Sequence, residues 1–249
     1  VVLSLGCWAG AVDSYQPISA NQAKAYIPLV ERQINQYGVL DSDGYWADDP
    51  RSYGICLART ADLNGDSTTE LLLGNYVQAG YVEVSVYTYK NGQAVYCGKV
   101  GVNFGEGGEI FLSKRDGITY VVVNQMVGGP IIRDEYQIYQ LQGNRLNRTM
   151  LLQNDYIGYD GSVYEEKYYI NGREVSRADF DYYYNLYQTE TAVIVGGEYA
   201  TSTTWDDFAK IKEQNIWYRK STSPVFVDGK EVTIRGYNIY DNNHYKLRD

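Results

Sequence analysis

Short runs of apolar and β-branched residues recur along the middle of the chain, and residues that favour tight turns bound each run. Such runs predict β-strands that bury at least one face. Asn91-Gly92, Asp116-Gly117 and Gly143-Asn144 are turn pairs that indicate hairpins, because their residues tolerate positive φ angles. Consecutive hairpins predict an antiparallel meander. The expected strands are Tyr53–Thr60, Leu71–Val77, Tyr81–Lys90, Gln93–Val100, Glu109–Lys114, Ile118–Asn124, Glu135–Leu141, Leu146–Leu152 and Val163–Ile170.

Three other segments repeat their apolar residues every three to four positions and therefore predict helices. The longest, Ser19–Tyr37, begins at a residue that can cap a helix, and Pro28 inside it predicts a kink or a later start. Thr204–Gln214 is the shortest. The third, Ser176–Gln188, has an aromatic stripe that we interpret as core packing, made of Phe180, Tyr183, Tyr184 and Tyr187.

Together these elements predict an α+β fold, mainly an antiparallel β meander with flanking helices. A full β-propeller is disfavoured, because the strands suffice for only about two four-stranded blades.

One loop between two expected strands carries oxygen-bearing side chains at regular spacing. Alternate residues of a tight loop converge, and Ca²⁺ prefers six to eight oxygen ligands. Gly65 lets the chain turn, and the twelfth position is Leu73, where an EF-hand needs a Glu. The sequence therefore predicts a calcium site of another kind, although an ordinary acidic turn would have similar residues. The expected ligands are Asp62, Asn64, Asp66 and Glu70, with the backbone carbonyl of Thr68.

Composition narrows the classes of function. The chain has 249 residues and a formal net charge of −9, which argues against nucleic acid and anionic membranes as partners and favours cations. Its only His is His244, so a catalytic triad or a His-rich zinc site is improbable. Cys7, Cys56 and Cys97 lack metal-binding spacing; Cys56 and Cys97 could pair, but buried free thiols are the expected state. The 27 Tyr residues suit either half-exposed strands or sugar-stacking surfaces.

The loop Asp62–Glu70 resembles the calcium loops of FG-GAP repeats, with Ser67 where that pattern has a second Gly. A second resemblance, to secreted proteins of clostridia and their relatives, rests on the Asp-rich loop with the strand after it, Asp62–Leu73, and on the VYTYKNG hairpin, Val86–Gly92. These resemblances imply an extracellular, bacterial protein.

The C-terminal segment resembles the opening of the copper amine oxidase N-terminal-like domain of bacterial surface proteins. The resemblance lies in the VDGK, YNI and NNxxKLRD phrases of Val225–Val232 and Tyr237–Asp249. It carries no amine oxidase chemistry, because a copper site needs several His ligands and only His244 is available. That domain normally continues beyond this point, so we expect a truncated copy.

The expected organisation has three parts. Residues 1–12 read as a signal-peptide remnant, and lipidation of Cys7 is the weaker alternative. Residues 13–219 form the α+β domain with the calcium loop, and residues 220–249 are a linker followed by the truncated segment. No stretch after the signal peptide is long enough to span a bilayer, so we expect an extracellular or cell-surface location.

Three functions follow from this reading. We expect a secreted or cell-surface, non-catalytic calcium-binding module whose partner is a cell-surface glycan or protein. A purely structural spacer and a carboxylate-dependent hydrolase are the alternatives. Adjacent carboxylates on a strand point to opposite faces, which makes poor acid–base pairs, although distant ones could meet in a cleft. The adjacent pairs are Asp48-Asp49, Asp134-Glu135, Glu165-Glu166 and Asp206-Asp207.

Overall fold

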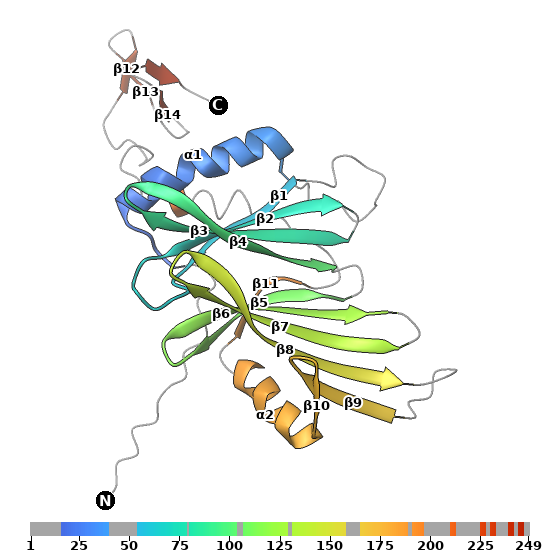
Figure 1. The fold of residues 1–249 in the computed structure, drawn as a ribbon. Coiled ribbons are helices and arrows are strands. Elements are labelled where there is room, and N and C mark those ends of the chain that lie inside the picture. The colour runs from blue at the N-terminus through green and yellow to red at the C-terminus, as the bar shows by residue number, and fades with distance from the viewer. Residues whose placement is uncertain are drawn as a thin grey trace, which may run out of the picture.

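The protein stacks its elements in four layers, in the order helix, sheet, sheet, helix (Figure 1). The computed structural model describes residues 16–39, 54–78, 80–103, 107–128, 131–157, 165–188, 191–196 and 210–212, and four short C-terminal segments, 225–227, 230–232, 239–241 and 244–246. Every strand pair within the two large sheets is antiparallel. The predicted α+β class with a mainly antiparallel β meander is therefore confirmed.

The first sheet is a meander of four strands in chain order. Its strands are β1 (Gly54–Ala61), β2 (Glu70–Gln78), β3 (Tyr81–Lys90) and β4 (Gln93–Asn103). The Asn91-Gly92 turn joins β3 to β4 with φ angles of 52° and 81°, the positive values that this turn pair predicts.

The second sheet has seven strands in the order β10-β9-β8-β7-β6-β5-β11. Its last strand in the chain, β11, returns after a helix to pair with β5 at the far edge. The bounds are β5 (Glu109–Arg115), β6 (Ile118–Val127), β7 (Ile132–Gln142), β8 (Arg145–Ile157), β9 (Glu165–Ile170), β10 (Arg173–Val175) and β11 (Thr191–Val195).

The core consists of three apolar clusters, one between each pair of adjacent layers. The largest fills the space between the sheets with side chains such as Leu72, Val84, Leu112 and Val121. Helix α1 (Ala20–Tyr37) covers the outer face of the first sheet, and helix α2 (Arg177–Gln188) covers the outer face of the second (Figure 1). Each sheet is therefore buried on both faces over much of its area.

The N-terminus of α1 is fixed by a reciprocal capping box. The Ser19 hydroxyl accepts the Gln22 N–H at 3.2 Å, and the Gln22 side-chain oxygen accepts the Ser19 N–H at 2.8 Å. The helix runs uninterrupted through Pro28 to Tyr37 and ends at Gly38, whose φ is 76°. The predicted capping residue and helix end are thus both correct, and the later start considered for Pro28 is not needed.

Two strands of the second sheet were not predicted from the sequence. Asn171-Gly172 turns β9 into β10, with positive φ at both residues, and the short strand β10 then leads into α2. The other missed strand, β11, has only five residues and follows α2 closely. Both are short edge strands, and only β11, Thr191-Ala192-Val193-Ile194-Val195, carries the apolar, β-branched run that predicts a strand.

Some predictions fall wholly or partly outside the described residues. These are the signal-peptide remnant, the carboxylate pairs Asp48-Asp49 and Asp206-Asp207, and most of the helix Thr204–Gln214, of which residues 210–212 are described as helical. Ile211 is fully buried in the cluster beneath α1. The C-terminal segment forms two small hairpins, β12 (Val225–Val227) with β13 (Lys230–Val232) and β14 (Ile239–Asp241) with β15 (His244–Lys246).

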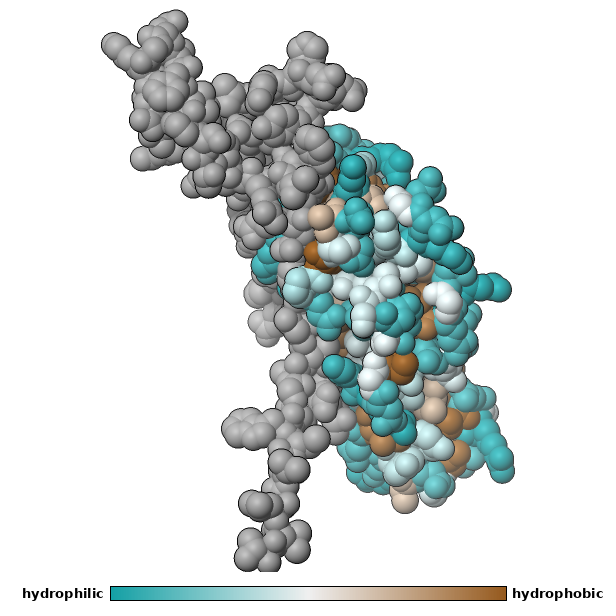
Figure 2. Space-filling view, turned by 90° about the vertical axis from the view of Figure 1, so that its left-hand side faces the viewer, coloured by the Kyte–Doolittle hydropathy of each residue, from teal (hydrophilic) through white to brown (hydrophobic). Residues whose placement is uncertain are grey.

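Cys56 and Cys97 are buried free thiols, as predicted. They lie on the two outer strands of the first sheet, separated by β2 and β3, a distance of roughly 14 Å that no disulfide can bridge. Figure 2 shows one side of the molecule, where apolar residues appear as separate spots between hydrophilic ones. In the described part of the chain, no helix is both long and apolar enough to cross a membrane.

Candidate functional site

The predicted calcium loop, Asp62–Glu70, joins β1 to β2 and curls around the Asp62 side chain. Its Oδ1 accepts the Gly65 N–H at 2.7 Å, and its Oδ2 accepts the Ser67 N–H at 2.9 Å. Asp66 Oδ1 accepts the Thr68 N–H at 2.7 Å, and Asn64 Oδ1 accepts the Asp66 N–H at 3.0 Å. The loop conformation is therefore held by its own side-chain oxygens.

Glu70 stands apart from the other predicted ligands because it is fully buried beneath the loop. One carboxylate oxygen accepts the Leu63 N–H at 2.9 Å, and the other accepts the Thr88 hydroxyl at 2.9 Å. Burial raises the pKa of Glu70 to about 7; the two hydrogen bonds oppose this rise, and the nearby Asp66 and Asp62 carboxylates add to it. Near neutral pH this side chain is thus close to half protonated.

Residues before α1 and within its first two turns fasten both ends of the loop. Gln22 Nε2 and the Tyr26 hydroxyl both donate to the Thr69 carbonyl, at 3.0 Å and 2.9 Å. At the other end, the Asp62 N–H donates to Gln16 Oε1 at 2.7 Å, and the Thr60 hydroxyl donates to the Gln16 carbonyl at 2.6 Å. The loop position is thus set by α1 and by the segment before it.

The second sheet closes on the same loop from the opposite side. The Thr119 N–H donates to the Leu63 carbonyl at 3.2 Å. Gly65 has a φ of 74°, and a Cβ added there would lie 2.6 Å from the Gly117 carbonyl oxygen. Glycine is therefore required at this position both by the backbone conformation and by the close approach of the β5–β6 turn.

These contacts bring Asp62, Asn64 and Asp66 together in the exposed or partly exposed loop and leave Glu70 in the core. Over the residues that the structure describes, no group of three or more His, Cys, Asp or Glu side chains is placed to hold a metal ion. For calcium to take the predicted ligand set, Glu70 has to exchange its two hydrogen-bond donors for the ion. Calcium binding by this loop stays a prediction.

A pocket of about 210 Å³ lies on the opposite side of the molecule, between α2 and the outer face of β7, β8 and β9. Ten residues line it, and half of them are aromatic. They are Asp134, Tyr136, Asn154, Tyr156, Glu166, Tyr168, Arg177, Phe180, Asp181 and Tyr184. This combination of ring faces with a few convergent polar groups is typical of ligand pockets.

The aromatic residues of the pocket hold one another in place through ring contacts. Tyr136 and Tyr184 meet edge to face with their centroids 5.0 Å apart, and Phe180 stacks on Tyr184 at 6.1 Å with an interplanar angle of 11°. Tyr168 packs against Phe180 from β9 at 5.2 Å. Such pairs order their rings beyond what burial alone provides.

Tyrosine hydroxyls anchor two of the three carboxylates. The Tyr156 hydroxyl donates to Asp134 Oδ2 at 2.9 Å, and the Tyr168 hydroxyl donates to Glu166. Burial, together with the hydrogen bond to Asp134, raises the pKa of Tyr156 to about 12, so this hydroxyl keeps its proton at neutral pH. Arg177 lies 3.5 Å from Asp181 and 4.0 Å from Glu166, with most of its side chain in solvent.

Asn154 is the most buried polar residue of the lining, with 9% of its surface exposed. Its Oδ1 atom is buried and accepts no hydrogen bond. A buried acceptor without a donor destabilises a fold by about 1 to 3 kcal/mol, so native proteins retain few of them. Asn154 belongs to the pocket lining, so a ligand that reached this oxygen would supply the missing donor.

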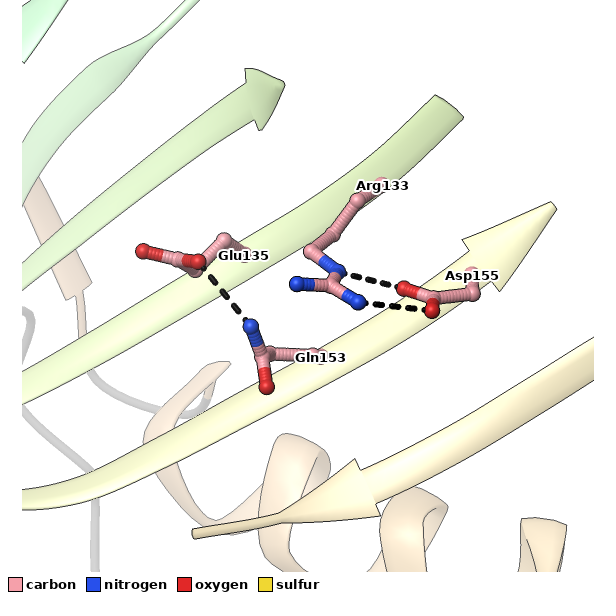
Figure 3. A network of polar contacts seen from close by, with 4 residues as sticks. All are labelled: Arg133, Glu135, Gln153 and Asp155. Carbon is pink, nitrogen blue, oxygen red and sulfur yellow. Dashed lines mark hydrogen bonds and ion pairs between the residues drawn. The ribbon is translucent and has the colours of Figure 1, made fainter. Parts of the chain in front are cut away.

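The opposite face of the same strands carries a separate polar network, shown in Figure 3. Arg133 makes a bidentate ion pair with Asp155 at 2.5 Å and 2.7 Å, and Gln153 Nε2 donates to Glu135 at 3.1 Å. Each pair joins residues directly opposite each other on β7 and β8. The network therefore fixes the register of these two strands, and so the positions of Asp134 and Asn154 on the other face.

Sequence reasoning separated the carboxylate pairs correctly but did not find the pocket. Asp134 and Glu166 line it, while their neighbours Glu135 and Glu165 fall on the other face, as strand alternation predicts. The α2 stripe packs on the core as predicted, with Phe180 and Tyr187 buried and Tyr183 and Tyr184 against the same cluster, while Phe180 and Tyr184 also line the pocket. The signal that could have revealed the pocket is tyrosine on α2 and on the facing strands β7, β8 and β9. A core closed to water would have Leu or Val at such positions.

Comparison with known proteins gave no match. No protein-family model, no curated protein and no solved structure matches this chain. Function has to be argued from its own residues.

Proposed function

We propose that this chain is a secreted or cell-surface, non-catalytic module that binds calcium at the loop Asp62–Glu70 and a surface glycan or protein at the α2 pocket. The observation that carries the binding role is the pocket itself, in which ordered aromatic rings and Asn154, whose buried Oδ1 has no donor, line one cavity. Such a lining supports recognition of a ligand that offers both an apolar surface and hydrogen-bond donors.

The fixed geometry of the pocket favours binding. The Arg133–Asp155 pair and the ring contacts with α2 order its walls before any ligand arrives. A site that is ordered in advance loses less conformational entropy on binding than a flexible one. The tyrosines also combine large contact areas with few rotatable bonds, which reduces that loss further.

Ligand binding is tested by screening the full chain on a glycan array and against surface-protein fragments, then measuring each hit by calorimetry. Tyr184→Ala should abolish binding, because it removes one wall of the pocket. Tyr182→Ala is the matched control, since Tyr182 is on the same helix but is 60% exposed and outside the lining. Equal loss in both variants would contradict the pocket as the site, and no hits at all would favour a structural spacer.

In this proposal calcium has a structural role. The ion would replace repulsion among the Asp62, Asp66 and Glu70 carboxylates with shared coordination, and so stabilise the turn between β1 and β2. Loop residues are already fastened by Gln16 and Gln22, so the fold does not depend on the ion.

Hydrolysis is the second candidate, because two carboxylates from different strands, Asp134 and Glu166, line the same pocket. A pair of carboxyl groups on opposite sides of a bound sugar is what glycoside hydrolysis requires. Both groups, however, accept a tyrosine hydroxyl rather than standing free. Release of reducing sugar from a glycan hit, lost in both Asp134→Asn and Glu166→Gln, would establish hydrolysis and overturn the non-catalytic proposal.

A further inference from the structure

We propose that the α2 pocket binds an alkylammonium group, that is, a protonated primary amine on an apolar stem such as a lysine side chain. This inference rests on the proposed binding function and names the class of ligand. It is carried by four independent features of the lining: its charge, its ring faces, its unpaired acceptor and the apolar residues at its border.

Charge is the first feature. Asp134, Glu166 and Asp181 bring three carboxylates to the lining, and Arg177 brings one cation. Arg177 is already within 3.5 Å of Asp181, and 71% of its side chain is exposed. A negative excess therefore remains at the pocket, within a chain whose net charge is −9. This field attracts cations to the site and disfavours phosphate, sulfate or a carboxylate ligand.

The aromatic walls favour the same sign of charge. A tyrosine ring face is electron-rich and attracts an ammonium group within about 6 Å of its centre. Tyr136, Tyr168 and Tyr184 come from β7, β9 and α2, so aromatic residues from three elements line the pocket. Aromatic walls combined with carboxylates are the usual chemistry for holding an organic cation.

The hydrogen-bonding groups of the lining favour an ammonium group over a neutral ligand. Carboxylates only accept hydrogen bonds, and Asn154 Oδ1 is an acceptor without a donor. The Tyr156 and Tyr168 hydroxyl protons are already donated to Asp134 and Glu166. The pocket thus presents mainly acceptors, and an ammonium group, with three donors and no acceptor, is their complement.

Apolar residues at the border of the pocket suit the stem. Met126 pairs with Asp134 across β6 and β7, and Ile132 pairs with Tyr156 across β7 and β8, so both lie on the pocket side of the sheet. Their side-chain surfaces are 43% and 49% exposed. An aliphatic chain that leaves the pocket over these residues would cover apolar surface that is otherwise in water. An amino sugar has no aliphatic stem, so these apolar residues favour a lysine-like ligand over an amino sugar.

The test titrates the full chain with matched pairs of small probes, followed by NMR and calorimetry. Nα-acetyl-lysine methylamide should bind, and the analogue with a methyl group in place of the ammonium, of nearly the same shape but uncharged, should bind at least about tenfold more weakly, since a charged hydrogen bond contributes that much. Glucosamine and N-acetylglucosamine form the second pair. Tighter binding of glucosamine than of the lysine probe would retain the amine but overturn the apolar stem.

Adjacent residues of β9 provide a matched pair of variants. Glu166→Gln should weaken binding of the lysine probe about tenfold, because it removes a carboxylate from the lining. Glu165→Gln makes the same change of charge one residue away, on the opposite face of the sheet, and should leave affinity within about twofold. Equal effects of the two variants would show that only net charge matters and would overturn the site.

The probes also separate failure of this inference from failure of the proposed function. If neutral sugars bind in a Tyr184-dependent manner and both amines do not, the module binds at the pocket but the ligand class is wrong. If no probe and no array ligand binds a chain that melts cooperatively, both proposals fail. Asn154→Leu provides a last check, because loss of amine binding in a folded variant assigns a ligand contact to that buried oxygen.

Discussion

The two helices cover equivalent faces of the two sheets, yet the interfaces beneath them differ. Helix α1 buries six of its 18 residues, chiefly aliphatic ones, against Ile55, Ala58, Leu71 and Leu73. Helix α2 buries two of its 12 residues, and it meets a sheet face that offers Tyr136, Asn154 and Tyr168. The interface beneath α1 is mainly aliphatic, whereas the one beneath α2 is rich in tyrosine and borders a pocket.

The difference lies in the side chains, not in the arrangement of the layers. Branched aliphatic groups interdigitate to native density and leave no hollow. Tyrosine rings are rigid, and their hydroxyl ends need polar partners. Beneath α2, Tyr136 and Tyr184 therefore lean on each other, and the hydroxyls of Tyr156 on β8 and Tyr168 on β9 donate to carboxylates. A helix on a sheet is therefore a packing layer or a binding site according to which residues it presents. Four predictions test this contrast, from the largest effect to the smallest.

Ile27→Ala on α1 should lower the free energy of unfolding by about 2 to 5 kcal/mol, because it leaves a cavity in a buried, mainly aliphatic cluster. Tyr184→Ala on α2 should lower it by about 1 kcal/mol, since that ring borders a pocket that is already open. Urea unfolding followed by circular dichroism measures both. The contrast breaks down if the two variants lose equal stability.

Glu70→Gln should make stability less sensitive to pH when a chelator is present. The pKa of Glu70 is raised from an ordinary value near 4.5 to about 7, so between these values the unfolded chain releases its proton first. Stability of the natural chain therefore falls as pH rises from about 4.5 to 7, and the full loss persists above pH 7. The variant should be more stable by roughly 3 kcal/mol at pH 8 and nearly equal at pH 4.5. A constant difference across that range in urea titrations would refute the assignment.

Two buried amides should respond in opposite directions when each is replaced by Leu. Gln22, on the α1 side, has both ends bonded, to Ser19 and to Thr69, so Gln22→Leu should destabilise by about 1 to 2 kcal/mol. Asn154, on the α2 side, has an unpaired Oδ1, so Asn154→Leu should stabilise by about 1 kcal/mol. Thermal unfolding of both variants checks the signs. Destabilisation by Asn154→Leu would mean that its amide is already satisfied.

Calcium should produce the smallest effect. Extracellular modules bind the ion with Kd of roughly 10⁻⁴ to 10⁻³ M, so about 1 mM calcium adds only about 0.4 to 1.4 kcal/mol and raises Tm by a few degrees. Asp66→Ala should abolish this calcium-dependent rise without preventing folding. Calorimetry that detects no binding at millimolar calcium, together with a melting curve that chelator leaves unchanged, would rule out the site.

Local signals explain what could be predicted from the sequence. Asn91-Gly92 and the capping residues Ser19 and Gln22 act within a few positions, so the hairpin and the start of α1 were predictable. The division of the strands into two stacked sheets depends on distant packing, and no local residue marks it. Glu70 illustrates the same limit at the loop, because its spacing predicts a ligand, whereas Thr88 from another strand draws its carboxylate into the core.

The fastening of the loop by Gln16, Gln22 and Tyr26 has a consequence for folding order. Each of these bonds spans between 43 and 47 residues, whereas β1 and β2 pair locally across the loop itself. Contacts between distant residues form late, because the chain must first close a long loop. During synthesis the N-terminal segment leaves the ribosome first, but it can form these bonds only after β1 and β2 have been synthesised. The hairpin excised alone would therefore lack this fastening, and the position of the loop belongs to the whole domain.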